Sequence, residues 1–197
     1  MREQIRMAVV QVGHALREPE EFAERWHSGA IHYNRWVWIS LLATAILGTT
    51  TYGMTMGLLG GAGVVFSKAF ACTFAAGMAW MIALPALYVL NSLGGSKLSI
   101  SSTVLAALVT VSWGGLAMMA SIPINWFFTT AVPHPRFVLL VNLIVFAGVG
   151  VAMIDVFRRV MRRLEPERGT YPAWWLCLVA AIGSELFFHL GLFTFGG

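Results

Sequence analysis

Residues 69–90 read AFACTFAAGMAWMIALPALYVL, a run of 22 residues without a charged side chain. The hydrocarbon core of a bilayer is about 30 Å thick, and a helix of about 20 apolar residues crosses it. A helix at the surface of a soluble protein would instead carry a polar face. This stretch therefore predicts a transmembrane helix, and it decides the class of fold.

Four further apolar stretches are long enough to cross a bilayer. We place the five spans at 36–58, 69–90, 103–122, 137–157 and 173–195. Short segments rich in glycine, proline or polar residues separate them, as expected where helices end. We expect an all-α, polytopic bundle of five transmembrane helices over residues 36–197, preceded by a cytoplasmic segment at 1–35.

Composition supports the membrane class. Of 197 residues, 58% are hydrophobic and 11% are charged, whereas a soluble domain has about 25% charged residues. The net charge is only +4, and we expect the lipid bilayer and other membrane proteins as partners, not nucleic acid. Cys72 and Cys177 lie far apart in apolar stretches, so we expect neither a disulfide nor a metal site.

The basic residues predict the orientation. In a five-span arrangement, eleven Lys and Arg residues fall on one side, and only Lys68 and Arg136 fall on the other. Because cytoplasmic loops retain Lys and Arg, we expect a cytoplasmic amino terminus and a periplasmic carboxyl terminus. We expect a multi-pass protein of a bacterial inner membrane.

The amino-terminal segment has its own pattern. Four apolar residues recur at the spacing of one helix face: Ile5, Val9, Val12 and Leu16. They predict an amphipathic helix on the cytoplasmic membrane surface. Pro19, followed by two glutamates, is typical of a new helix start, and we expect a second short helix through Trp26.

Basic residues also follow the fourth span. Four arginines there could attract anionic lipid head groups, at about 1 kcal/mol for each charge: Arg158, Arg159, Arg162 and Arg163. Topology alone explains their sign, so lipid recognition is not required. Asp155 precedes the first two arginines by three and four residues, the spacing of an ion pair on a helix.

Glu185 and His189 are the sharpest functional candidates. They lie four residues apart in the last predicted span, hence on one helix face. An ionisable residue at this depth costs several kcal/mol unless it is paired, protonated or in a polar cavity. We interpret the pair either as a proton-exchanging site or as a neutral hydrogen-bonded pair that fixes the helix register.

His189 could instead bind a haem or chlorophyll metal. A bis-histidine haem needs a second histidine at membrane depth, and the other four lie outside the spans: His14, His27, His32 and His134. The first three of these lack cysteine or carboxylate partners at zinc spacing. We therefore expect no metal and no cofactor, with pigment or haem binding as an alternative.

Small and polar residues within the spans predict helix packing. Gly53, Gly57 and Gly61 form two Gly-xxx-Gly steps, which let another helix approach closely, either within the chain or from a partner subunit. Pro85 removes a backbone hydrogen bond and should kink the second span. Asn142 is expected to hydrogen-bond between helices.

The order of parts resembles a known group. An amphipathic segment with REPEEF at 17–22 precedes five spans, and the second of these carries ALPALYVLN at 83–91. The chain resembles uncharacterised bacterial membrane proteins distantly similar to the Yip family, whose five-span eukaryotic members interact with Rab GTPases and have a cytoplasmic amino terminus. In the bacterial group the last span carries Gly-x-Gln, where this chain has Glu185. The resemblance implies a fold and supplies no activity.

No Gly-x-Ser-x-Gly, His-Glu-x-x-His or phosphate-binding glycine motif occurs in the sequence. We therefore expect no enzyme, but a non-enzymatic membrane subunit or scaffold that packs within a larger complex. Proton-linked or small-solute transport through Glu185 and His189 is the first alternative. Pigment or haem binding through His189 is the second.

Overall fold

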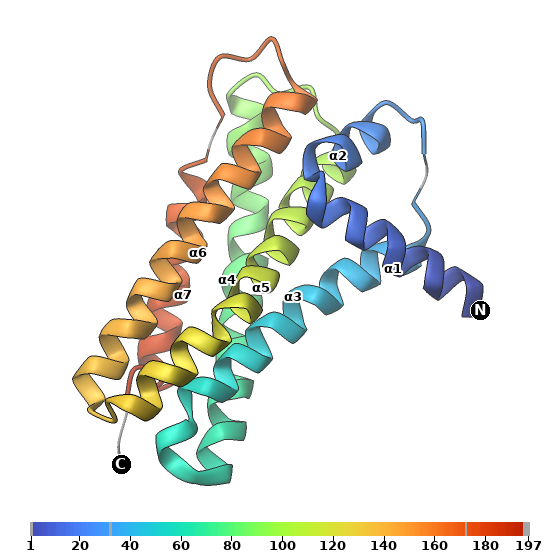
Figure 1. The fold of residues 1–197 in the computed structure, drawn as a ribbon. Helices are drawn as coiled ribbons and strands as arrows, with labels where there is room; N and C mark the ends of the chain where they lie inside the picture. The colour runs from blue at the N-terminus through green and yellow to red at the C-terminus, as the bar shows by residue number, and fades with distance from the viewer. Residues whose placement is uncertain (1, 32, 172, 195–197) are drawn as a thin grey trace.

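The computed structural model describes residues 2–31, 33–171 and 173–194, with side chains left out at 2–5, 8 and 9. Over these residues the fold is all-α, as predicted (Figure 1). Its elements are α1 (Arg2–Arg17), α2 (Pro19–His27), α3 (Arg35–Met56), the 3-10 turn η1 (Leu58–Gly60), α4 (Gly61–Leu93), α5 (Ile100–Ala131), α6 (Pro135–Leu164) and α7 (Trp175–His189).

Four helices, α3 to α6, are long and apolar enough to cross a membrane. The last predicted span is shorter than expected, because α7 has 15 residues and ends at His189. A turn with Gly191 at φ 65° follows, a backbone conformation that glycine adopts without strain. Residue 195, the predicted end of this span, lies outside the described residues.

The other helices extend beyond their predicted spans. α4 begins at Gly61, so the glycine-rich segment that we expected to be a connection is its first turn. α5 continues past residue 122, the predicted end of its span, through Pro123 to Ala131. α6 runs on to Leu164. Hydropathy predicts only the part of a helix inside hydrocarbon, whereas the backbone hydrogen bonds can continue past it.

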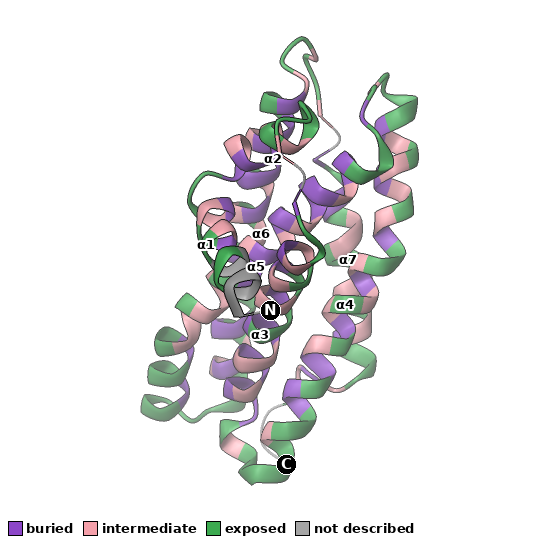
Figure 2. Ribbon diagram, turned by 90° about the vertical axis from the view of Figure 1, so that its right-hand side faces the viewer, coloured by how far each residue is buried: buried purple, intermediate pink, exposed green. Residues whose placement is uncertain are grey.

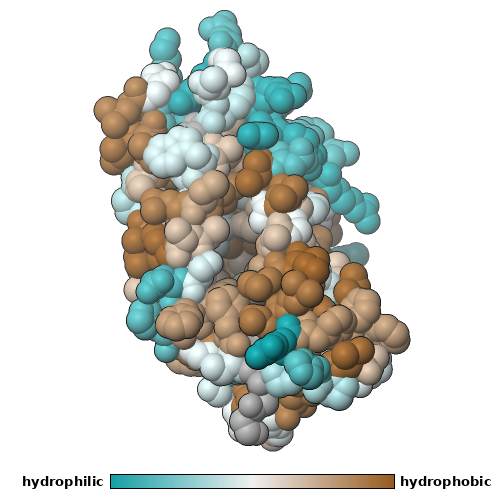
Figure 3. Space-filling view, turned by 90° about the vertical axis from the view of Figure 1, so that its left-hand side faces the viewer, coloured by the Kyte–Doolittle hydropathy of each residue, from teal (hydrophilic) through white to brown (hydrophobic). Residues whose placement is uncertain are grey.

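The five helices α3 to α7 run up and down in an antiparallel bundle (Figure 1). α3 packs against both α4 and α5, α6 packs against α5, and α7 packs mainly against α4. Buried and exposed residues alternate along the helices of the bundle (Figure 2). We call the end of the bundle that carries α2 and the loop at 165–174 the arginine end. Polar atoms gather at that end, and apolar atoms cover much of the same face below it (Figure 3).

α3 and α5 approach each other closely at two glycines. A Cβ atom built on Gly48 would lie 2.1 Å from the carbonyl oxygen of Gly115, and one built on Gly115 would lie 2.8 Å from the Cα of Ala45. Lipid chains are as apolar as the side chains, so helices in a membrane associate through close packing and hydrogen bonds. Glycine at both positions allows this approach.

The amino-terminal helices α1 and α2 form where the sequence predicts them. Their buried side chains pack against α3 and α5, with Val12 and Phe22 among them. Val12, on the predicted apolar face of α1, is therefore covered by protein. The side chains of Ile5 and Val9 lie outside the described part of the chain.

Tyr33 fastens α2 to the start of α3. Its hydroxyl donates a hydrogen bond of 3.0 Å to the carbonyl oxygen of Phe22, and the two rings stack with centroids 4.1 Å apart. Burial raises the pKa of the Tyr33 hydroxyl, because desolvation disfavours the phenolate.

Candidate functional site

Glu185 and His189 lie on the outer surface of α7. The imidazole Nε2 is 3.0 Å from the Glu185 carboxylate, and the side chains are 72% (Glu185) and 67% (His189) exposed. Among the described residues, the pair therefore faces neither an internal cavity nor a neighbouring helix. It occupies the last turns of α7 instead of the middle of a long span, because the helix ends at His189.

Lys68 holds the carboxyl end of α7 against α4. Its ammonium group donates hydrogen bonds to the carbonyl oxygens of Gly191 and Thr194, the latter at 2.8 Å, and its side chain is largely buried. A cation is favourable at a helix carboxyl end, where carbonyl groups lack partners. Lys68 lies seven residues, about 10 Å of helix rise, into α4. Along the length of the bundle, the end of α7 therefore lies level with Lys68 and not with the start of α4 at Gly61.

An apolar groove of about 260 Å³ lies between α4, α6 and α7. Its lining includes Trp80, Phe146, Met153 and Phe187. The groove exists because α6 and α7 make little contact, while each packs closely on another helix. Glu185 and His189 are not among its lining residues.

A buried polar cluster joins α3, α5 and α6. Tyr52 donates a hydrogen bond of 2.8 Å to the Asn142 amide oxygen, which also accepts one of 3.3 Å from Asn125. The Asn125 amide donates to Thr55 at 2.7 Å, and Asn142 donates to the carbonyl of Val138 at 2.8 Å. The predicted interhelical role of Asn142 is confirmed. Asn125 gives the same signal in the sequence as Asn142, an amide side chain in an apolar helix.

At the arginine end, two of the four arginines that could attract lipid head groups form ion pairs with α2. Arg159 lies 3.3 Å from Glu20 and Arg163 lies 2.7 Å from Glu24. Arg159 also pairs with Asp155 at 3.0 Å, which confirms the predicted ion pair within the helix. Arg158 and Arg162 are exposed.

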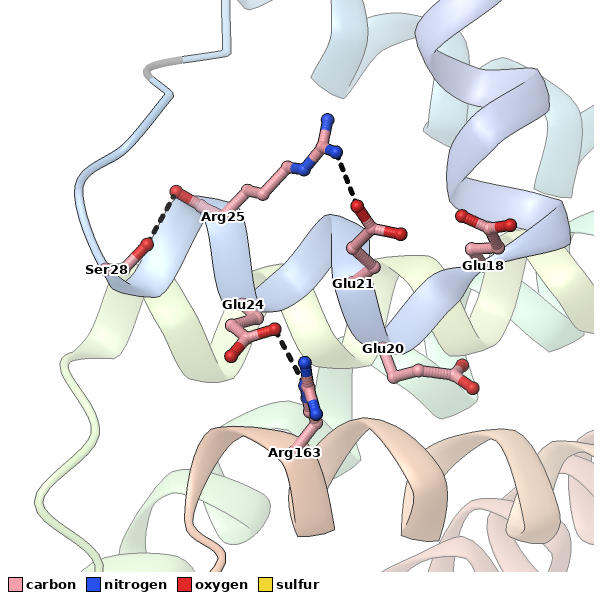
Figure 4. Close-up of a pocket in the computed structure, with 7 residues that line it drawn as sticks. All are labelled: Glu18, Glu20, Glu21, Glu24, Arg25, Ser28 and Arg163. Carbon is pink, nitrogen blue, oxygen red and sulfur yellow. Dashed lines mark hydrogen bonds and ion pairs between the residues drawn. The ribbon is translucent and has the colours of Figure 1, made fainter.

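A shallow polar pocket opens between α2 and the end of α6 (Figure 4). Four glutamates reach it, and Arg25 and Arg163 each pair with one of them. A side-chain hydrogen bond with Glu18 and the charge of Arg25 lower the pKa of the Glu21 carboxyl. His14, Glu18 and Glu21 also bring one ligand atom each within 4.8 Å of one another. The sequence does not reveal this grouping, because its residues come from both sides of the break between α1 and α2.

A second set of polar contacts at the arginine end joins the residues that follow α6 to the end of α4 and to the loop between α4 and α5. Arg168 donates a hydrogen bond of 2.6 Å to the side-chain oxygen of Asn91 and pairs with Glu165 at 3.1 Å. The Glu165 carboxylate also accepts from the Ser96 hydroxyl at 2.8 Å and from the Lys97 backbone N–H at 2.9 Å. Arg168 and Glu165 therefore hold the segment after α6 against the segment after α4. The sequence shows that both segments carry charged residues, but it does not predict this contact.

The predicted packing glycines differ in their surroundings. A Cβ atom on Gly53 would lie 2.7 Å from the Cβ of Cys72, and one on Gly57 would lie 2.5 Å from the Cα of Val65, both in α4. A Cβ atom on Gly61 would meet nothing within 4 Å, but Gly61 has φ 70°. This glycine therefore allows the chain to turn into α4, and it does not make a close helix contact. α4 continues as a helix through Pro85.

Comparison with known protein families, with characterised proteins and with solved structures finds no match to this chain.

Proposed function

We propose that this chain is a non-enzymatic subunit of a membrane protein complex and that the outer face of α7 binds another membrane protein. The observation that carries the proposal is the exposure of Glu185 and His189 on a helix whose sequence is otherwise apolar or small. An ionisable group facing hydrocarbon costs about 3 kcal/mol. A protein partner that covers the pair would remove this cost.

The proposal includes a five-span topology in a bacterial inner membrane, with the arginine end in the cytoplasm. Two features support it: α7 runs antiparallel to α4 along the apolar bundle (Figure 1), and Lys68 fixes the end of α7 about two helical turns inside α4. In this topology Arg158 and Arg162 lie where anionic lipid head groups would meet them.

The proposed docking face is tested by adding bulk to it. Ala181 lies on the exposed side of α7, and Ala120 lies on the exposed side of α5. We expect the wild type and Ala120→Trp to be extracted in mild detergent as a complex, and Ala181→Trp as a lone chain. Mass photometry in native lipid discs measures the difference. A wild-type protein that is monomeric at every concentration would contradict the proposal.

The same pair would serve the alternatives. Glu185 accepting a proton from His189 across 3.0 Å is a geometry suited to proton-linked transport, and Glu185→Gln should then abolish flux into liposomes. His189 as a ligand of a pigment or haem, bound between subunits, predicts an absorption band in the purified protein. A colourless preparation would argue against this second alternative.

A further inference from the structure

We infer that the groove between α4, α6 and α7 binds one hydrocarbon chain of an anionic phospholipid from the cytoplasmic leaflet, and that Arg158 pairs with the phosphate of its head group. The inference uses the membrane placement proposed above, but it needs no protein partner on α7. It assigns a ligand to a groove that Glu185 and His189 do not line.

The lining of the groove suits a hydrocarbon chain. Among the described residues that line it, none carries a charge, and Ser184 supplies the one hydroxyl group. Apolar atoms cover much of this side of the molecule below the arginine end (Figure 3). Sites for polar ligands place several polar groups around the ligand, and this groove offers almost none. An apolar chain needs no such partners.

The groove is as long as one leaflet of the bilayer is thick. Along α6 its lining runs from Leu143 to Ile154, and along the antiparallel α7 it runs from Phe187 to Leu176. Each stretch rises about 16 Å, and half of a hydrocarbon core of about 30 Å is about 15 Å. A helix of this length would fill roughly 1,000 Å³ with its side chains, whereas the groove has a volume of about 260 Å³. The groove is therefore too narrow to enclose a partner's helix, and it suits a single extended chain.

Arg158 gives the groove a charged end. It follows Ile154, the last lining residue of α6, by four residues, so it lies one helical turn, about 6 Å, beyond the groove. Its side chain is exposed and pairs with no acid among the described residues, whereas Arg159 and Arg163 already pair with α2. A guanidinium group can donate two parallel hydrogen bonds to a phosphate. A phospholipid whose chain lies in the groove would bring its phosphate to this level.

The opposite end of the groove offers no comparable group. The basic residue of α6 on that side is Arg136, seven residues or about 10 Å from Leu143. Lys68 of α4 lies near that end, but it is largely buried and its ammonium group binds carbonyl oxygens that follow α7. The difference orients the lipid, with its head group at the arginine end and its chain toward the middle of the membrane.

Gly150 and Gly148 test the groove with matched variants. A Cβ atom on either glycine would meet nothing within 4 Å, yet Gly150 lines the groove and Gly148 does not. When the delipidated protein is titrated with phosphatidylglycerol in mild detergent, we expect native mass spectrometry to show one lipid bound to each wild-type chain. Gly150→Leu should lose this lipid, because the new side chain fills the groove, and Gly148→Leu should keep it. Equal binding by the two variants would overturn the inference.

The charged end is tested with a second pair of variants. Arg158→Gln should weaken the binding of phosphatidylglycerol about fivefold, which is the contribution of one basic side chain near anionic lipid. Arg136→Gln removes the same charge at the other end of α6 and should leave binding unchanged. Phosphatidylcholine with the same chains, which has no net charge, should bind the wild type more weakly than phosphatidylglycerol does. A larger loss with Arg136→Gln than with Arg158→Gln, or equal binding of the two lipids, would contradict the inference.

The failure of this inference can be told from the failure of the proposed function. Gly150→Leu should still be extracted as a complex, and Ala181→Trp, whose position does not line the groove, should still bind the lipid. A chain that keeps its complex but binds no phosphatidylglycerol would overturn this inference alone. A wild-type chain that binds the lipid but is monomeric at every concentration would overturn the proposed function alone.

Discussion

Asn142 in α6 and Glu185 in α7 are both polar residues within apolar helices, yet their surroundings differ. Asn142 is fully buried and hydrogen-bonds to Tyr52, Asn125 and the backbone of its own helix. Glu185 is 72% exposed, and the described residues give it His189 as its partner. The first group completes its contacts within the chain. Glu185 can accept further hydrogen bonds on the outer face of α7, which is where a contact with another membrane protein would form.

The largest predicted effect concerns the interior contact. Gly48→Leu should lower the free energy of unfolding by about 3 kcal/mol, because any side chain at this position meets the backbone of Gly115. Gly148→Leu is the control, since a Cβ atom there meets nothing within 4 Å. Reversible unfolding in mixed micelles measures both variants. Equal stability of the two would refute the close contact between α3 and α5.

Asn142→Leu and Glu185→Leu sharpen the comparison directly. Removing Asn142 leaves the buried Tyr52 hydroxyl and Asn125 amide short of an acceptor, which should cost about 2 kcal/mol. Removing Glu185 should not lower the stability of the lone chain, because the side chain is exposed and its described partner, His189, lies on the same helix. A monomer destabilised more by Glu185→Leu than by Asn142→Leu would reverse our assignment of interior and exterior.

Lys68→Met should release the carboxyl end of α7. The loss of a cation at this helix end should cost about 1 kcal/mol, and the effect should be local. Hydrogen exchange is expected to speed up in the turn at 190–194 and to stay unchanged in α3. Uniformly faster exchange over the whole bundle would show instead that Lys68 supports the global fold.

The smallest effect is expected at the arginine end. Replacing both Glu20 and Glu24 with Gln removes two exposed ion pairs with α6, each worth about 0.5 kcal/mol. Protease cleavage in the connection at 28–34 should become faster, and 0.5 M salt should produce the same change in the wild type by screening, since the Debye length falls well below 10 Å. An unchanged cleavage rate in both experiments would show that apolar packing alone holds α2.

The sequence predicts the helical class, the long apolar helices and the amino-terminal helix pair, because hydrophobicity and helix-start signals are local. It also predicts the pairing of Asp155 with Arg159 and an interhelical role for Asn142. It does not predict that Arg159 and Arg163 bind α2, or that Lys68 caps α7, since these contacts join segments far apart in the chain. Nor does it separate an inward-facing polar residue from an outward-facing one. Asn142 and Glu185 give the same signal in the sequence, and only packing distinguishes them.

The account depends on α7 lying within the membrane, with its two ends on opposite sides. Single cysteines at Gly169 and Thr194, in a chain with Cys72→Ser and Cys177→Ser, test this with a membrane-impermeant maleimide applied to intact cells. We predict that Thr194→Cys is labelled from outside and that Gly169→Cys is labelled only after lysis. Labelling of both positions under the same condition would place both ends of α7 in one compartment and contradict the account.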